Sequence, residues 1–301
     1  MSSSQLKIFA LVCMVIDHIG EFIPGAPIYF RWIERISAPI FIFVFVNSID
    51  YTRNKSLFIR RLYLFNVITS ICMWICNHVA NKENEQLFVS NNIFATFVAI
   101  FFLISLLNQI KNRIAGWRRE FVLYCAYQII TLILIYIGLA LPALKSTYIA
   151  DETILLLMQI SCNVFWVEGN VFIVFMGVIL YYLRNCKWKM SLGYIAAVGC
   201  DTILILEQIP ARLYNKVNLL GNRFLSLCTE IMCNISGYEF RYYESVDYLH
   251  EYYFWIMIFA LPFILLYNGK KGSYHKYFYY IFYPFHIIVL VCIQSILTPR
   301  C

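Results

Sequence analysis

The chain has 301 residues, of which 61% are hydrophobic and only 14% are charged, and its mean hydropathy is +0.68. This composition excludes a soluble globular domain and indicates a polytopic membrane protein. The formal net charge is +7, but the basic residues lie in short connections between apolar segments. The charge therefore indicates membrane topology and not a nucleic-acid partner.

Apolar segments recur along the whole chain, and each is long enough to cross a hydrocarbon layer of about 30 Å as a helix of about 20 residues. They are too long and continuous for the strands of a membrane barrel, so we expect an all-α helical bundle. No repeat or soluble domain interrupts them, and residues 1–301 are expected to form one domain. The predicted spans, about nine with a range of eight to ten, are 5–24, 31–50, 57–79, 90–109, 120–142, 153–183, 190–207, 251–268 and 277–297.

The connections between these spans alternate in charge. The even-numbered ones are basic, as from Arg53 to Arg61 and from Lys270 to Lys276, whereas the odd-numbered ones are neutral, acidic or mixed. This alternation predicts a cytoplasmic N-terminus and an outer C-terminus. We therefore expect a multi-pass protein of the cell (plasma or inner) membrane, with the lipid bilayer as its surroundings.

Two segments depart from simple crossings. Segment 153–183 is too long for one untilted span, and Asn163 and Glu168 interrupt it, which predicts a short re-entrant or broken helix followed by a full crossing. The connection 208–250 is the only long one and is predicted to lie outside. Its apolar part, 219–233, is expected either to lie in the interface or to dip back into the membrane.

Ionisable groups inside the spans are the first candidates for function, because each costs roughly 2.5 to 3.5 kcal/mol to insert. The first span carries Asp17, His18 and Glu21, and Arg35 lies near the outer end of the second. A short turn joins the two spans, so all four side chains reach a similar depth. Since neighbours on a helix point about 100° apart, we expect Asp17 to pair with Arg35 and His18 to face a cavity. An ion pair and a hydrogen-bonded histidine without chemistry would explain the same residues.

The last span adds a second intramembrane histidine, His286, which is expected near the midplane. Tyr283 lies three residues earlier and shares its face. Pro284 loosens the helix there, which membrane helices tolerate when neighbours satisfy the released carbonyl. The 11 cysteines have no metal-site spacing, so no metal is expected.

Several short motifs occur in an order typical of one membrane family. They are Leu6-Lys7-Ile8, Met14-Val15-Ile16-Asp17-His18-Ile19-Gly20, Arg35-Ile36-Ser37-Ala38-Pro39-Ile40-Phe41, Tyr51-Thr52-Arg53-Asn54, Arg61-Leu62, Asn92 to Thr96, Leu266 to Gly272, and Phe282-Tyr283-Pro284-Phe285-His286. With them the chain resembles the TraX family over nearly its whole length. The resemblance implies acetyl or acyl transfer, because the founding member is associated with N-acetylation of conjugative pilin. The family is also similar to multi-span acyltransferases that use cytoplasmic acyl-CoA.

For such a reaction the expected catalytic residues are His18, Asp17, Arg35 and His286. His18 would act as the general base on a hydroxyl or amine acceptor, with Asp17 or Glu21 tuning it. Arg35 or His286 would stabilise the oxyanion. Direct attack on the thioester and a covalent acyl-histidine relay both remain open.

The donor and substrate are expected to bind on the cytoplasmic side. Arg53 and Arg61, beside Asn54, would hold the phosphates of acyl-CoA, although topology alone also explains these arginines. Asn92, Glu21 and Tyr283 complete the expected binding residues in the spans. The acceptor would be a peptide, a glycan or a small metabolite.

A rival function uses the same intramembrane groups. Asp, His and Arg inside a membrane also form proton relays, so a secondary transporter or proton-coupled carrier is the alternative. It lacks the internal repeat that many carriers show. A non-catalytic scaffold would explain the spans but not the buried charges.

Overall fold

A computed structural model describes residues 1–81, 89–90, 92–140, 148–236, 247, 249–250, 252–273 and 277–297. Over these residues the chain is helical and forms no strand, which confirms the predicted fold class. Residues 82–88 of one predicted connection, residues 143–147 of another, and the last two residues of the predicted span 120–142 lie outside the described residues. The helices are α1 (Ser3–Phe22), α2 (Tyr29–Tyr51), α3 (Lys55–Asn81), α4 (Ile93–Lys111), α5 (Trp117–Ala140), α6 (Tyr148–Ser161), α7 (Asn170–Leu183), α8 (Lys187–Leu206), α9 (Ile209–Leu219), α10 (Arg223–Ser236), the 3-10 helix η1 (Tyr253–Ala260), α11 (Leu261–Leu265) and α12 (Phe278–Leu297).

Six of the described helices are long and apolar enough to cross a membrane, namely α2, α3, α4, α5, α8 and α12. The other predicted crossings correspond to α1, to α6 with α7, and to η1 with α11. Helix α1 has 20 residues but carries Lys7, Asp17 and Glu21, and it packs against α2 and α12. The bundle therefore has the helices that the predicted spans require, and the count of nine crossings remains a prediction.

The long segment predicted to be interrupted is a broken helix. Helix α6 ends at Ser161 and α7 begins at Asn170, and the backbone has positive φ at Cys162, Gly169 and Asn170. Helix α6 packs against α3 and α5, whereas α7 packs against α2, α4 and α8. The break brings Glu168 beside α4, where the Thr96 hydroxyl donates to its backbone carbonyl at 2.9 Å.

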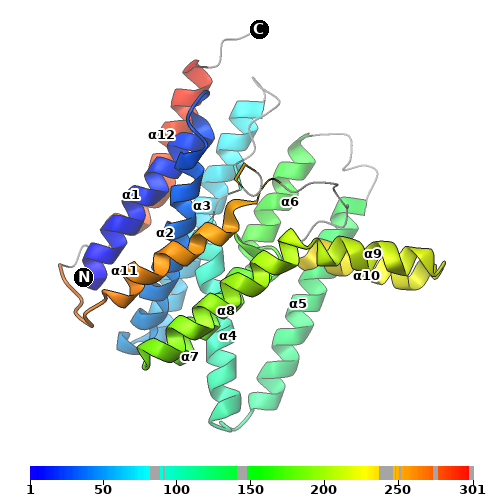
Figure 1. Cartoon of the computed structure of the whole chain (residues 1–301), viewed down its shortest axis with the longest axis horizontal. Coiled ribbons are helices and arrows are strands. Elements are labelled where there is room, and N and C mark those ends of the chain that lie inside the picture. The colour runs from blue at the N-terminus through cyan, green and yellow to red at the C-terminus, as the bar shows by residue number, and fades with distance from the viewer. Residues whose placement is uncertain are drawn as a thin grey trace.

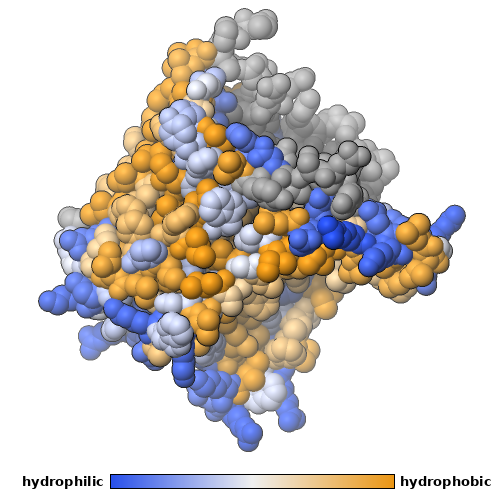
Figure 2. Space-filling model, in the orientation of Figure 1, coloured by the Kyte–Doolittle hydropathy of each residue, from blue (hydrophilic) through white to orange (hydrophobic). Residues whose placement is uncertain are grey.

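The course of the chain agrees with the charge alternation. In Figure 1 the N-terminus and the turn between α7 and α8 lie at the lower left, the turn between α4 and α5 lies at the bottom, and the last turn of α12 lies at the top. Figure 2 shows hydrophobic residues over most of the visible flank and hydrophilic residues along the lower and left edges. The basic connections thus share one end of the bundle, which the positive-inside rule assigns to the cytoplasm.

The long outer connection contains the helical hairpin α9–α10. The two helices pack against each other, and Figure 1 shows them extending sideways beyond α5. Their junction exposes Leu219, Leu220 and Phe224, with exposed fractions of 87%, 72% and 75%. The predicted interfacial or re-entrant course of 219–233 remains a prediction.

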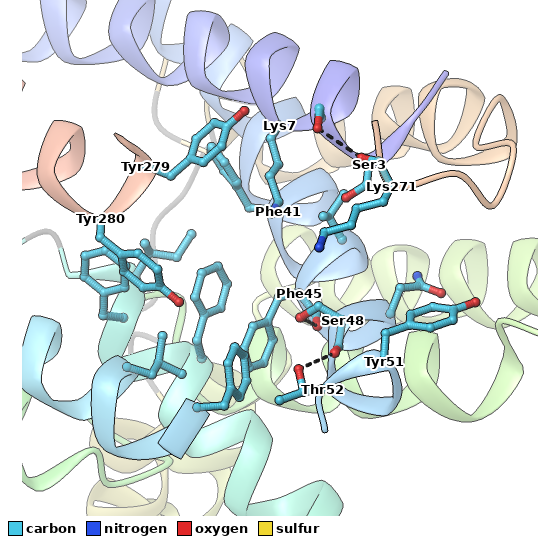
Figure 3. Close-up of a pocket in the computed structure, with 18 of the residues that line it drawn as sticks. Ser3, Lys7, Phe41, Phe45, Ser48, Tyr51, Thr52, Lys271, Tyr279 and Tyr280 are labelled. Carbon is cyan, nitrogen blue, oxygen red and sulfur yellow. Dashed lines mark hydrogen bonds between the residues drawn. The ribbon is translucent and has the colours of Figure 1, made fainter. Parts of the chain in front are cut away.

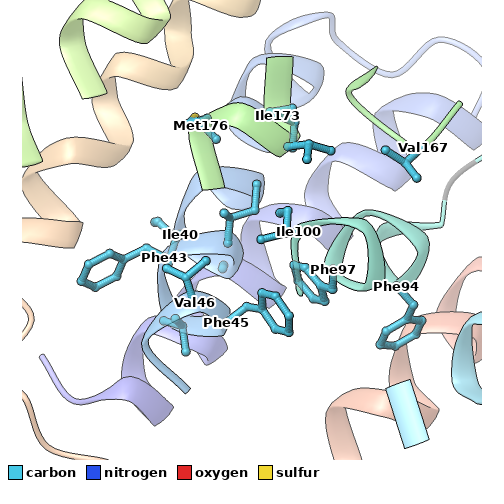
Figure 4. Close-up of a cluster of buried hydrophobic side chains, with 14 of the residues drawn as sticks. Ile40, Phe43, Phe45, Val46, Phe94, Phe97, Ile100, Val167, Ile173 and Met176 are labelled. Atoms are coloured by element: carbon cyan, nitrogen blue, oxygen red, sulfur yellow. The ribbon is translucent and has the colours of Figure 1, made fainter. Parts of the chain in front are cut away.

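The core lies where α2, α4 and α7 meet. Figure 4 shows Phe45, Phe97, Ile100 and Met176 from these helices in one cluster, and all four are buried. The Phe45 and Phe97 rings stack with centroids 4.5 Å apart. Helix α7 approaches α4 at Gly177, where an added Cβ would lie 2.7 Å from Ile100 Cδ1. This packing fixes the helices that surround the candidate site.

Candidate active site

The outer ends of α1 and α2 hold a cluster of paired charges. The Arg31 guanidinium lies 2.9 Å from Asp17 Oδ1 and 3.0 Å from Glu21 Oε2. The Asp17 side chain is completely buried, so this pairing offsets a high desolvation cost. Removing either partner would leave a charge buried without compensation.

The predicted pairing of Asp17 with Arg35 was wrong. Arg35 instead pairs with Glu34 at 3.0 Å and lies over the Phe254 ring of η1 at 4.4 Å. Gly20 brings α1 and α2 close together, because a Cβ there would lie 2.8 Å from Phe30 Cβ. This contact sets a register in which Arg31, one turn before Arg35, faces Asp17.

His18 and His286 form a hydrogen-bonded pair between α1 and α12. His18 Nδ1 lies 2.7 Å from His286 Nε2, and the two side chains are 2% and 7% exposed. His286 Nδ1 donates to the Phe282 carbonyl at 2.8 Å. Because a carbonyl only accepts, the proton of a neutral His286 is on Nδ1, so its Nε2 accepts from His18 Nδ1. In the neutral pair the lone pair of His18 is therefore on Nε2.

Asp17 lies beside the histidine pair, but it makes no hydrogen bond to His18. His18 Nε2 is 3.9 Å from Asp17 Oδ2, which is longer than a hydrogen bond. The carboxylate is nevertheless close enough to stabilise an imidazolium at His18. As helix geometry predicts, adjacency in sequence does not make Asp17 the hydrogen-bond partner of His18.

A cavity of about 620 Å³ lies on the cytoplasmic side of the histidine pair. Its walls come from α1, α2, α3, α4, α12 and the connection after α11. Arg53, Asn54, Arg61 and Tyr283, all predicted site residues, line it. Glu21 and Asn92 are not among the lining residues. The structure thus brings four of the six predicted binding residues together.

The cavity is also lined by two further cations that were not among the predicted binding residues. They are Lys7 of α1 and Lys271 of the connection after α11. Figure 3 shows both side chains entering the same space, with Phe45 and Ser48 of α2 on the other side. No aspartate or glutamate is among the described residues that line the cavity. An excess of positive charge without a nearby carboxylate favours an anionic ligand.

The Arg61 side chain has a hydrogen-bond donor that no protein group satisfies among the described residues. Its Nε is buried and has no hydrogen-bond partner among the described residues. An unsatisfied buried donor of this kind is costly, by about 1 to 3 kcal/mol, unless a ligand or water pairs with it. Arg61 is therefore suited to hold an anion at the cavity wall.

The inner end of the cavity is apolar and approaches the histidines. Phe94, Phe97 and Phe282 line it together with Met14 and Tyr283. Met14 lies one helical turn before His18, and Phe282 lies one turn before His286. The cavity thus has a basic mouth and an apolar inner end, and it stops one turn short of the histidine pair.

The Asn92 side chain caps helix α4 and ties it to helix α3. It is 1% exposed, its side-chain oxygen accepts from the Phe94 amide at 3.2 Å, and it caps α4. Its amide nitrogen donates to Asn66 Oδ1 and to Ser70 Oγ, both at 2.8 Å. These contacts join α4 to α3 beside the cavity.

Asp17, His18 and Glu21 also offer ligand atoms within 4.8 Å of one another, close enough for a metal ion. The guanidinium of Arg31 contacts both carboxylates and therefore occupies the place that a cation would take. This arrangement favours an ion pair over a metal centre.

The fold and site define a class of protein: a multi-pass helical membrane protein with a cavity that is basic at its mouth and leads toward a buried histidine pair. The chain belongs to the TraX family, since the family model described as TraX protein matches residues 2–294. TraX is a pilin acetylase family, so membership indicates a pilin-modifying membrane protein and, more generally, a transferase. No curated protein and no solved structure matches the chain.

Proposed function

We propose that the protein transfers an acetyl or other short acyl group from cytoplasmic acyl-CoA to a hydroxyl or amine acceptor. The observation that carries this proposal is the cavity itself, which has a basic mouth without carboxylates and an apolar end near two hydrogen-bonded histidines. Its volume, about 620 Å³, is within the range of small-molecule sites.

The cavity matches the two chemical parts of an acyl-CoA. Arg53 and Arg61 on one wall and Lys7 and Lys271 on the other would contact the phosphates through charge-assisted hydrogen bonds. The pantetheine arm is largely apolar with a few amides, and it would lie along the aromatic side chains further in. The thioester would then reach the inner end of the cavity.

His18 is the proposed general base. In the neutral pair the proton of His18 is on Nδ1, which donates a hydrogen bond to His286 Nε2. The Nε2 atom of His18 therefore carries the lone pair. The acceptor would lose its proton to Nε2 as it attacks the thioester carbon, and Asp17 at 3.9 Å would stabilise the imidazolium. In this role His286 is a positioning residue that fixes the tautomer of His18.

The test is an acyl-transfer and hydrolysis assay with acetyl-CoA on the full chain in nanodiscs. We expect His18→Ala to lower the rate by about 10²-fold to 10⁴-fold, the usual contribution of a general base. His78→Ala is the matched control, because His78 lies on α3 and contacts Glu152 at 3.3 Å, away from the cavity. Wild-type turnover by His18→Ala would disprove the role given to His18.

A further inference from the structure

The broken crossing carries a carboxyl group without an assigned role. Glu168 lies in the segment between α6 and α7, at a depth where an ionisable group is costly. Its neighbour Gly169 has φ of 76°, and a Cβ there would lie 2.2 Å from Ile173 Cγ1. The backbone is thus held in a conformation that only glycine adopts easily, and this conformation positions Glu168.

The side chain of Glu168 is directed at Tyr283 of α12. The Tyr283 hydroxyl donates to Glu168 Oε2 at 3.4 Å and accepts from the Ile93 amide at 3.2 Å. The backbone amide of Asn92 also donates to the Glu168 carboxyl. The hydroxyl is therefore fixed between the first turn of α4 and the break.

Tyr283 contacts both the cavity and the histidine pair. It lines the inner end of the cavity, whereas Glu168 is not among the lining residues. The Tyr283 ring meets the His286 ring edge-on, with centroids 5.8 Å apart. Tyr283, a candidate proton donor, thus lines the cavity and contacts His286, which is hydrogen-bonded to the proposed base His18.

We infer that Tyr283 is the acid that protonates the leaving sulfur, and that Glu168 is the positioning residue that supplies its proton. This inference rests on the proposed acyl transfer. Acyl transfer from a thioester expels a thiolate, and a neighbouring hydroxyl can neutralise this developing charge by giving up its proton. A tyrosine hydroxyl is therefore a suitable proton donor to such a leaving group.

The acceptor X–H forms an X–C bond to the thioester carbon, and its proton moves to His18 Nε2. The C–S bond breaks, and its electron pair remains on sulfur, which takes the proton of the Tyr283 hydroxyl. For this transfer the hydrogen bond between the two side chains is reversed: Glu168 in its acid form donates to the Tyr283 oxygen, the hydroxyl proton is directed at sulfur, and the phenolate then takes the proton of Glu168. Water then carries one proton from His18 to Glu168, so the net products are the acylated acceptor and a free thiol.

The test compares two donors that differ in how much their leaving groups need an acid. S-acetyl pantetheine expels an alkyl thiolate, whereas S-acetyl 4-nitrothiophenol expels a thiolate that is stable without a proton. We expect Tyr283→Phe and Glu168→Gln to lower kcat/KM about 10²-fold with acetyl-CoA and with S-acetyl pantetheine. With the aryl donor we expect a loss of less than about threefold, because no acid is needed.

The control is Glu152→Gln, because Glu152 is another glutamate of the same broken crossing, is buried and lies beside His78. It should leave both rates unchanged. An equal loss with the alkyl and aryl donors would mean a structural role and would overturn the inference, as would no loss with either. If the wild type cleaves none of the three donors, the proposed function fails as well, so the two failures are distinguishable.

Discussion

The charges at the outer ends of α1 and α2 and the charges that line the cavity are balanced differently. At the outer ends of α1 and α2, Arg31 bridges Asp17 and Glu21 at 2.9 and 3.0 Å, and Arg35 pairs with Glu34. On the cytoplasmic side four cations line one cavity without a carboxylate among the described lining residues. Paired charges hold helices together, whereas unbalanced charge around a cavity indicates a ligand. The histidine pair lies between these two regions, the ion-paired outer cluster and the basic cavity.

The difference changes how the most conspicuous charges of the sequence are interpreted. Asp17 and Arg35, both expected to take part in catalysis, lie in ion pairs of the outer cluster, and Asp17 is also 3.9 Å from His18. Lys7 and Lys271 look like ordinary topology signals, yet they line the cavity. Depth within the membrane therefore identifies candidate groups, but the local balance of charge separates structural groups from those available to a ligand.

The largest expected effect concerns the outer half. Arg31→Ala should lower the free energy of unfolding by about 3 to 5 kcal/mol, because it leaves Asp17 buried without its partner. Thermal unfolding in detergent measures this change. Adding Asp17→Asn should restore much of the loss by removing the unpaired charge.

The control for that prediction is Arg119→Ala, since the Arg119–Glu120 pair lies on the surface with side-chain exposures of 80% and 46%. It should change stability by less than about 1 kcal/mol. Equal stability of the Arg31 and Arg119 variants would remove the structural assignment of the outer cluster.

A smaller effect is expected at the histidine pair His18–His286. His286→Ala should lower acyl transfer about 10²-fold, because His18 loses the acceptor that fixes its tautomer. His286→Gln should recover much of the rate, since its amide oxygen also accepts from His18 Nδ1. Activity is measured with acetyl-CoA, and no recovery in the glutamine variant would argue against a positioning role.

The smallest effect concerns the break between α6 and α7. Gly169→Ala should destabilise the protein by about 1 to 3 kcal/mol, since φ is 76° and the new Cβ would meet Ile173. Gly199→Ala is the control, because Gly199 lies within α8 and an added Cβ meets nothing within 4 Å. There alanine should be neutral or stabilising by up to about 1 kcal/mol. If Gly199→Ala lowers the unfolding midpoint more than Gly169→Ala does, the backbone at the break does not require glycine.

The positions of the helices could be predicted from the sequence because hydropathy and charge alternation depend on local composition. The break at 162–169 was also predictable, since Asn163 and Glu168 interrupt an overlong apolar segment. The partner of Asp17 could not be predicted, because Arg31 and Arg35 are one turn apart on α2. The contact of Gly20 with Phe30 decides between them, and it depends on helix packing.

The histidine pair could not be predicted either. His18 and His286 are 268 residues apart, and counting residues from the helix starts gives depths of about 20 Å and about 13 Å. The two helices are staggered, and stagger between distant helices leaves no signal in one sequence. The cavity residues Arg53, Asn54, Arg61 and Tyr283 were predictable because family motifs singled out those positions.

The most direct test of the central claim is the binding of acetyl-CoA to the purified full chain, measured by calorimetry. We predict that wild type and Arg60→Ala bind alike, because Arg60 is exposed and does not line the cavity. Arg53→Ala/Arg61→Ala should weaken binding more than about tenfold, since each charge-assisted contact contributes about 1.5 to 3 kcal/mol. No binding by the wild type, or equal binding by the double variant, would contradict a phosphate-bearing donor in this cavity.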